Sequence, residues 1–135
     1  MAVGQFVFML HSHLPYYRKA GMWPFGEENL YECMAETYVP LLNAISELYD
    51  EGIKAKLTVG ITPILAEQLN DEHLKQGFVE YLDSRIKSVS KDLDRYPDPK
   101  VPHSQHLKYL AKYYFDWFNN IKDSFVNKYH MDLIS

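Results

Sequence analysis

The stretch Gln5-Phe-Val-Phe-Met-Leu-His-Ser-His-Leu-Pro-Tyr16 joins a short apolar run to a pair of histidines and a proline. A continuous apolar run of this length, Gln5–Leu10, is typical of a strand that is buried on both faces of a parallel sheet. Side chains alternate along an extended backbone, so His11 and His13 are expected on the same side of it. Ligands of barrels and open α/β sheets bind at the carboxyl ends of the strands. The stretch therefore predicts a first strand that leads directly into a candidate site.

Helical and strand patterns alternate along the rest of the chain. Pro40 is expected to kink or divide the first helix, and Asp71 to cap a later one. The expected elements are a strand over 5–10, a helix over 27–51, a strand over 54–61, helices over 64–69, 71–93 and 104–127, and the start of a strand over 131–135. Strands separated by helices pair in parallel through right-handed crossovers. This order predicts an α/β fold, and a strand that starts at residue 131 indicates a chain cut in mid-fold.

Composition and charge exclude several classes of protein. The chain has 135 residues, is 47% hydrophobic and carries a net charge of −4, which predicts one folded domain without a basic surface for nucleic acid. Cys33 is the only cysteine, so no intrachain disulfide is possible and a reducing compartment is expected. The apolar N-terminal run is too short to span a membrane and lacks the features of a signal peptide. We expect a cytoplasmic protein that does not associate with membranes.

Three explanations of the His-x-His pair follow from the residues alone. The imidazoles are ligands of a metal ion, hydrogen-bonding groups for a substrate, or structural anchors of the turn at Pro15. A metal site needs further ligands, and the other histidines fall on predicted helices or loops that need not approach the first strand. No Asp or Glu follows the second strand. The pattern favours a structural or substrate-binding role over metal binding.

Several longer motifs carry a resemblance to a known family. They are His11-Ser-His-Leu-Pro-Tyr-Tyr-Arg-Lys-Ala-Gly-Met-Trp-Pro-Phe-Gly-Glu-Glu28, Ala35-Glu-Thr-Tyr-Val-Pro-Leu-Leu42 and Thr62-Pro-Ile-Leu-Ala-Glu-Gln-Leu69. In this order the three motifs resemble the N-terminal part of glycoside hydrolase family 57. Within the family they are most similar to the α-1,4-glucan branching enzymes.

The resemblance implies an incomplete (β/α)7 TIM-like barrel with its site at the carboxyl ends of the strands. Residues 1–135 are then the N-terminal portion of the catalytic barrel, truncated at the C-terminus. The resemblance implies that His11, His13 and Tyr16 bind substrate beside the scissile bond and are not metal ligands. It places Trp23 in a loop that borders the glucan cleft, where the indole either stacks on a sugar or anchors the loop on the barrel rim.

The reaction implied for the intact enzyme is a retaining glucan transfer. A carboxylate attacks the anomeric carbon of an α-1,4 linkage, and the 6-hydroxyl of a second glucan displaces it to form an α-1,6 branch. Retention requires a nucleophile and an acid/base roughly 5–5.5 Å apart. The resemblance places both carboxylates beyond residue 135, so the chain carries no catalytic residue and is expected to be inactive alone. The implied partner is an α-glucan of the amylose or glycogen type, and no cofactor is required.

Two other functions stay open at this point. One is a non-catalytic carbohydrate-binding module, or a module completed by a separately encoded partner. The other is a metal-dependent barrel hydrolase, such as a deacetylase, that uses His11 and His13. An open sheet edge is further expected to promote self-association. The sequence does not separate branching from other transfer or hydrolysis of α-glucans.

Overall fold

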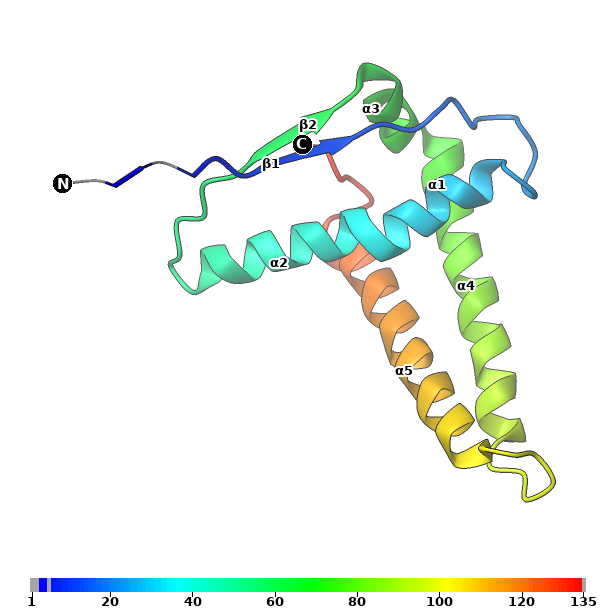
Figure 1. Ribbon diagram of the computed structural model, residues 1–135. Coiled ribbons are helices and arrows are strands. Elements are labelled where there is room, and N and C mark those ends of the chain that lie inside the picture. The colour runs from blue at the N-terminus through cyan, green and yellow to red at the C-terminus, as the bar shows by residue number, and fades with distance from the viewer. Residues whose placement is uncertain (1–2, 5, 135) are drawn as a thin grey trace.

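Two short parallel strands lie beside a set of helices in the computed structural model, which describes residues 3–4 and 6–134 (Figure 1). Strand β1 (Met9–Ser12) pairs with β2 (Thr58–Ile61) so that Leu10 lies opposite Val59 and Ser12 opposite Ile61. The helical segments are α1 (Glu27–Cys33), the π-helical η1 (Met34–Tyr38), α2 (Val39–Asp50), α3 (Pro63–Asn70), α4 (Glu72–Arg95), α5 (Ser104–Asp123) and the π-helical η2 (Ser124–Lys128). The parallel pair and the alternation of strand and helix confirm the α/β prediction.

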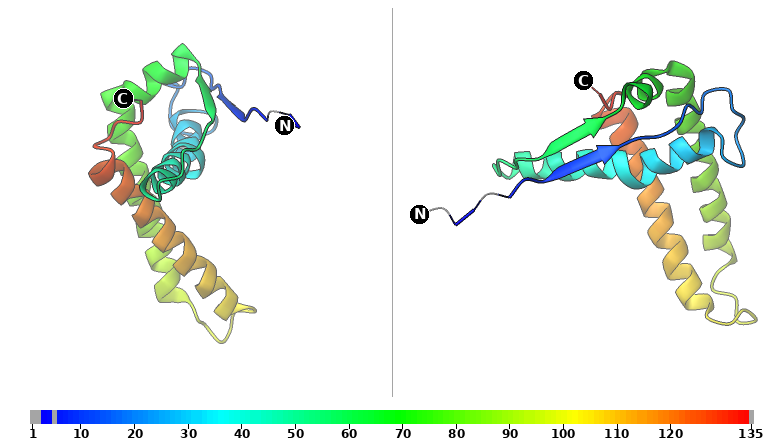
Figure 2. Two further views of the ribbon diagram at one scale, coloured as in Figure 1. Left: turned by 90° about the vertical axis from the view of Figure 1, so that its left-hand side faces the viewer. Right: turned by 45° about the horizontal axis from the view of Figure 1, so that its top comes forward.

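The first strand lies further along the chain than the apolar run predicts, and it is not buried on both faces. Phe6, Val7 and Met9 are 88%, 74% and 66% exposed. The pairing of the two strands begins near Phe8, whose carbonyl accepts a hydrogen bond of 2.9 Å from the Thr58 N–H. In the described part of the chain the sheet has two strands with helices over one face (Figure 2), so the other face has no covering layer. Gln5, where the predicted strand begins, lies outside the described residues.

The predicted helix over 27–51 is observed as a continuous helical path through α1, η1 and α2. Its middle is a wider π-helical stretch, Met34–Tyr38, which ends two residues before Pro40. Proline has no N–H, and its ring crowds the carbonyl of the fourth residue before it, which here is Glu36. A π-helical turn relieves that conflict without ending the helix. The interruption expected at Pro40 is therefore a widened turn.

Helices α4 and α5 form a long antiparallel hairpin that projects away from the sheet (Figure 1). Asp71 caps α4 as predicted, since its Oδ1 accepts a hydrogen bond of 3.1 Å from the Leu74 N–H. The proline-rich break at 96–102 forms the tip of the hairpin. Among the helices of the described residues, none combines the length and apolar character that a bilayer crossing requires.

The strand predicted to start at residue 131 is not observed. His130 and Met131 adopt left-handed backbone angles, with φ of 53° and 62°, and the Met131 N–H donates to the Phe125 carbonyl at 2.8 Å. These residues close the end of the last helix, and Leu133 then turns into the core with 9% of its surface exposed. The backbone of this segment therefore bonds to the last helix, and the Leu133 side chain packs in the core, so neither adds a strand to the sheet. Ser135 lies outside the described residues.

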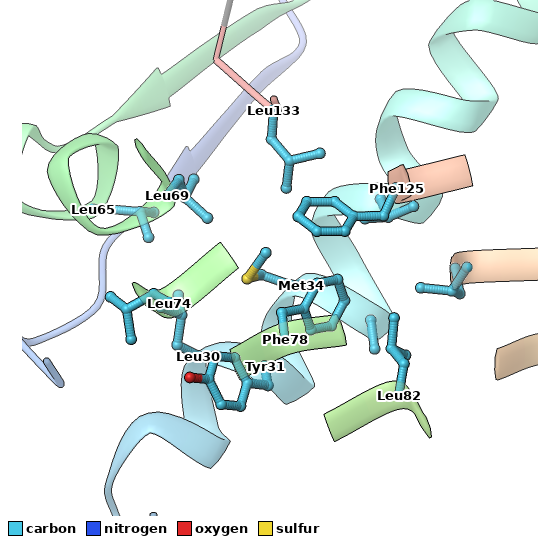
Figure 3. Packing of buried hydrophobic residues seen from close by; sticks show 13 residues of the cluster. Leu30, Tyr31, Met34, Leu65, Leu69, Leu74, Phe78, Leu82, Phe125 and Leu133 are labelled. Atoms are coloured by element: carbon cyan, nitrogen blue, oxygen red, sulfur yellow. The ribbon is translucent and has the colours of Figure 1, made fainter. Parts of the chain in front are cut away.

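The buried core lies mainly between the helices, at one end of the sheet (Figure 3). Phe78 of α4 packs edge-on against Phe125 of η2, with ring centroids 4.9 Å apart and an interplanar angle of 77°. Tyr31 of α1 and Leu65 of α3 join the same cluster and are fully buried. The segment that follows β1 crosses the surface of this helical core, which provides the framework for the candidate site.

Candidate functional site

His11 lies on the face of the sheet that is turned away from the helices. Leu10 and Ser12, its neighbours in β1, are half-buried and line a space between the sheet and the helices. Because side chains alternate along a strand, His11 projects from the opposite face. Its partner in the register is Gly60, where an added Cβ would lie 3.1 Å from His11 Nδ1. The absence of a side chain at Gly60 thus leaves room for the imidazole.

The position of His11 differs from the prediction in one respect. The apolar run places both histidines after the strand, but His11 is the third residue of β1 and only His13 follows it. The difference arises because pairing with β2 starts near Phe8 and continues to Ser12. Both histidines are exposed, so both imidazoles are accessible to a ligand.

The carboxyl end of β1 is tied to the helical layer by Ser12. Its Oγ and the hydroxyl of Tyr38 lie 2.6 Å apart and share a hydrogen bond. Burial raises the pKa of the Tyr38 hydroxyl, although the bond to Ser12 acts in the opposite direction. The phenol therefore stays protonated at neutral pH. On the other side, the Thr62 N–H donates to the Ser12 carbonyl at 3.3 Å.

A cavity of about 310 Å³ separates the sheet from α2 and α3. Most of its lining is apolar, and none of the residues lining it is acidic. They are Leu10, Ser12, Thr37, Tyr38, Leu41, Leu42, Ile45, Val59, Ile61, Leu65, Leu69 and Leu133, and His11 also borders the cavity from its place between Leu10 and Ser12 on β1. This cavity offers no carboxylate for general acid, general base or nucleophilic chemistry.

Gln68 of α3 holds the backbone on both sides of Tyr16. The Tyr17 N–H donates to Gln68 Oε1 at 2.7 Å, and Gln68 Nε2 donates to the Pro15 carbonyl at 3.0 Å. The same amide nitrogen donates to the Ile64 carbonyl at 3.3 Å. Gln68 is only 1% exposed, whereas the Tyr16 side chain is 51% exposed. The segment therefore presents a tyrosine to solvent from a fixed backbone.

Two carboxylates hold the residues that follow. Asp71 forms an ion pair with Arg18. Glu27, 7% exposed, accepts hydrogen bonds from the Lys19 N–H at 2.9 Å and from the Tyr31 hydroxyl at 3.2 Å, and its Oε1 lies 3.3 Å from His73 Nε2. Glu27 stands in the first turn of α1, where a carboxylate complements the helix dipole, and it is also a buried anchor of the loop.

These contacts shift the pKa values of two groups. Burial opposes ionisation of Asp71, but the hydrogen bond from the Leu74 N–H and the pair with Arg18 outweigh it and lower the pKa of the carboxyl. Burial, the nearby charge of Glu27 and the hydrogen bond to it raise the pKa of Tyr31 well above its usual range. Asp71 is therefore charged and Tyr31 neutral at physiological pH.

Trp23 lies in a turn whose two ends are joined by backbone contacts. The Glu27 N–H donates to the Gly21 carbonyl at 2.8 Å, and the Glu28 N–H donates to the Met22 carbonyl at 3.3 Å. A Cβ on Gly26 would lie 2.0 Å from the Gly21 oxygen, so this close approach requires glycine. Trp23 itself is 78% exposed. These backbone bonds hold the turn, and the indole is free to contact a ligand.

The four residues predicted to bind substrate, His11, His13, Tyr16 and Trp23, share one stretch of chain, but among the described residues the structure shows no hydrogen bond or ring contact between them. The same described part of the chain contains no group of three or more His, Cys, Asp or Glu side chains arranged to hold a metal ion. The anchors Gln68 and Glu27 were not predicted; Gln68 carries a signal, since it is polar and stands between the apolar Leu65 and Leu69.

Comparison with known proteins places this geometry in context. Residues 7–134 match the family described as Glycosyl hydrolase family 57. The chain is 44% identical to a 1,4-alpha-glucan branching enzyme of Thermococcus kodakarensis over 116 residues. The aligned region covers 84% of this chain and 17% of that enzyme. A crystal structure of a family 57 branching enzyme from that archaeon, in complex with glucose, superposes on 94% of the chain with a TM-score of 0.82 and 37% identity, and 22% of that structure is covered.

A second solved structure gives the same result. The family 57 branching enzyme of the archaeon Pyrococcus horikoshii superposes on 94% of the chain with a TM-score of 0.84 and 37% identity, and 23% of it is covered. The chain thus spans about a fifth of the length of the relatives it matches. Its two parallel strands and their helices match part of a larger fold.

Proposed function

The chain belongs to glycosyl hydrolase family 57, and from that membership we propose that it forms the first two β/α units of the incomplete (β/α)7 barrel of a 1,4-α-glucan branching enzyme. The similarity to branching enzymes supports the choice of activity within the family. The two parallel strands, with a helical crossover between them, are the repeating unit of such a barrel. Branching activity and the glucan substrate are proposals for the whole enzyme.

The observation that carries the proposal is the position of His11. In a β/α barrel the helices form the outer ring, so the sheet face without helices is the interior. His11 projects from that face, near the carboxyl end of β1, with Gly60 leaving space beside it. Ligands of such barrels bind at the carboxyl ends of the strands. This position supports a substrate-binding role for His11 inside the barrel.

The roles of the site residues follow from their chemistry. The ring nitrogens of His11 and His13 donate or accept hydrogen bonds, which suits sugar hydroxyls. Tyr16 and Trp23 offer flat apolar faces with polar edges, which suit pyranose rings. We assign these four residues to substrate binding, and none of them to a covalent step.

The covalent steps need groups from outside this chain. Retaining transfer requires two carboxylates roughly 5–5.5 Å apart, and neither β1 (Met9–Ser12) nor β2 (Thr58–Ile61) contains an acidic residue. In the proposed reaction one carboxylate attacks the anomeric carbon while the other protonates the leaving 4-oxygen. The 6-hydroxyl of an acceptor glucan, deprotonated by the second group, then displaces the enzyme carboxylate. The present residues hold the donor sugar during both steps.

A chimeric enzyme tests the proposal. The aligned segment of the Thermococcus kodakarensis enzyme is replaced by this chain, and α-1,6 linkages formed from amylose are measured by proton NMR. We expect branches from the chimera and none from the 135-residue chain alone. His11→Ala in the chimera should lower branching at least tenfold, whereas His106→Ala, at an exposed site on α5, should leave it unchanged. A folded chimera that leaves amylose linear would refute the proposed function.

The exposed Tyr16 and Trp23 on a fixed backbone also favour a second function, carbohydrate binding without catalysis. Binding by the isolated chain would slow its migration in a native gel that contains amylose. Retardation by the chain together with an inactive chimera would favour the binding module. Free migration of a folded chain would exclude autonomous binding.

A further inference from the structure

Gln68 makes a set of hydrogen bonds that its own helix does not require. It is fully buried on the apolar side of α3, where most helices place an aliphatic residue. Its amide makes three hydrogen bonds, and two of them reach the backbone of a segment about fifty residues away in sequence. Burying a polar side chain destabilises a protein unless its polar atoms form hydrogen bonds, and here the loop backbone supplies most of these partners.

We propose that Gln68 is a positioning residue that fixes Tyr16 for glucan binding, an inference that rests on the proposed function. The bonded groups, the Pro15 carbonyl and the Tyr17 N–H, lie directly before and after Tyr16. A single planar amide thus clamps both peptide groups that flank this residue. The direction in which the Tyr16 side chain leaves the backbone is set by that clamp, although Gln68 itself does not contact the sugar.

The chemistry of the amide suits this role better than an acid would. Gln68 Oε1 meets an N–H donor, while Nε2 meets the two carbonyl oxygens of Pro15 and Ile64. A carboxylate at this position would direct negative charge at both carbonyls and would be buried. An aliphatic side chain would leave the Pro15 carbonyl and the Tyr17 N–H without their partner. Glutamine therefore matches both kinds of backbone group, the Tyr17 N–H and the carbonyls of Pro15 and Ile64.

The other anchors of the segment act further along. Arg18 and Lys19 are held by Asp71 and Glu27, so the chain after Tyr17 remains attached to the helices when Gln68 is changed. Loss of the amide therefore frees a short stretch around Tyr16 and leaves the rest of the loop in place. We therefore expect weaker glucan binding, because a preorganised contact is lost, while the rate at which bound glucan reacts stays largely unchanged.

Gln68→Met in the chimeric enzyme tests the inference, since methionine has a similar length and no hydrogen-bonding amide. We expect KM for amylose to rise about tenfold, equivalent to about 1.4 kcal/mol, with kcat changed less than twofold. Gln76→Met, at an exposed position of α4, is the matched control and should leave KM unchanged. In a Tyr16→Ala background, the rise in KM caused by Gln68→Met should disappear, because both changes remove the same contact.

Hydrogen exchange of the 135-residue chain provides a second readout that does not depend on activity. Gln68→Met should accelerate exchange of the Tyr17 amide while the amides of α4 keep their protection. An unchanged KM, or a rise in KM of equal size in the Tyr16→Ala background, would overturn the inference. An inactive chimera would refute the proposed function instead. In that case unchanged exchange at Tyr17 would still show that Gln68 does not fix the segment.

Discussion

Replacing Gly77 by alanine should destabilise the protein, although such a change inside a helix normally stabilises it. Gly77 lies in α4, directly under the buried ring of Tyr31. A Cβ at this position would lie 2.1 Å from the Tyr31 hydroxyl oxygen and 2.9 Å from its Cζ. The ring has no room to retreat, because Phe78 and Tyr81 pack around it with centroids 6.1 Å and 5.8 Å away.

The magnitude follows from three contributions. Alanine gains about 1 kcal/mol over glycine in helix propensity. Against this stands an overpacking cost of about 2 kcal/mol for forcing a methyl group into a filled site. Displacing the Tyr31 hydroxyl also weakens its hydrogen bond to the buried Glu27 carboxylate, which is worth about 1.5 kcal/mol. The free energy of unfolding should therefore fall by about 2.5 kcal/mol.

Urea unfolding followed by far-UV circular dichroism measures the change. Ser84→Ala, at an exposed position of the same helix, is the control and should raise the midpoint slightly. In a Tyr31→Phe background the nearest atom is gone and the hydrogen bond is already absent, so Gly77→Ala should cost clearly less. The reasoning would be refuted if Gly77→Ala raised the midpoint as Ser84→Ala does, or cost the same in both backgrounds.

Three further predictions concern charge, binding and association. The ionised Asp71 carboxylate stabilises the fold above about pH 4, and this stabilisation is lost as the pH falls through the lowered pKa of Asp71 in the folded state. Asp71→Asn should therefore flatten the pH dependence of the urea midpoint between about pH 2 and 6, and an unchanged pH profile would contradict the prediction. Trp23→Ala in the chimeric enzyme should raise KM for amylose severalfold without moving the melting temperature, whereas Tyr109→Ala on α5 should not; equal effects of the two would argue against sugar stacking. The exposed apolar run before β1 should cause concentration-dependent self-association in sedimentation velocity, which Val7→Lys should reduce; a monomer at every concentration would exclude it.

The helices could be predicted from the sequence because their signals are local. Apolar spacing and the Asp71 cap each act within one or two turns, and the structure shows both. The strands were harder because their limits depend on the partner. Phe6 and Val7 have strand-forming side chains, but β2 begins only at Thr58, so they stay unpaired and exposed. Likewise, the apolar residues after Met131 look like a strand, although they close a helix end and fill the core.

The candidate site divides in the same way. The His-x-His pair and Trp23 could be picked out because their residue types and spacing belong to a long family motif. The sheet face of His11 could not, since it depends on which side the helices occupy. The loop anchors are not evident from the sequence for a related reason: Glu27 looks like any acidic residue in a first helical turn, but its partners include Lys19 of the preceding loop and His73 of α4.

The buried polar groups show where the rigidity of the site originates. The residues proposed to touch sugar come from one stretch, 11–23, which has little regular structure beyond β1. Such a stretch would lose much conformational entropy on binding if it were free. Instead, buried Gln68 of α3 and Glu27 of α1 hold its backbone, and Asp71, the N-cap of α4, pairs with the Arg18 side chain before any ligand arrives. Glucan affinity should therefore depend on α1, α3 and α4 as strongly as on the exposed aromatic rings, because the helices determine where those rings are held.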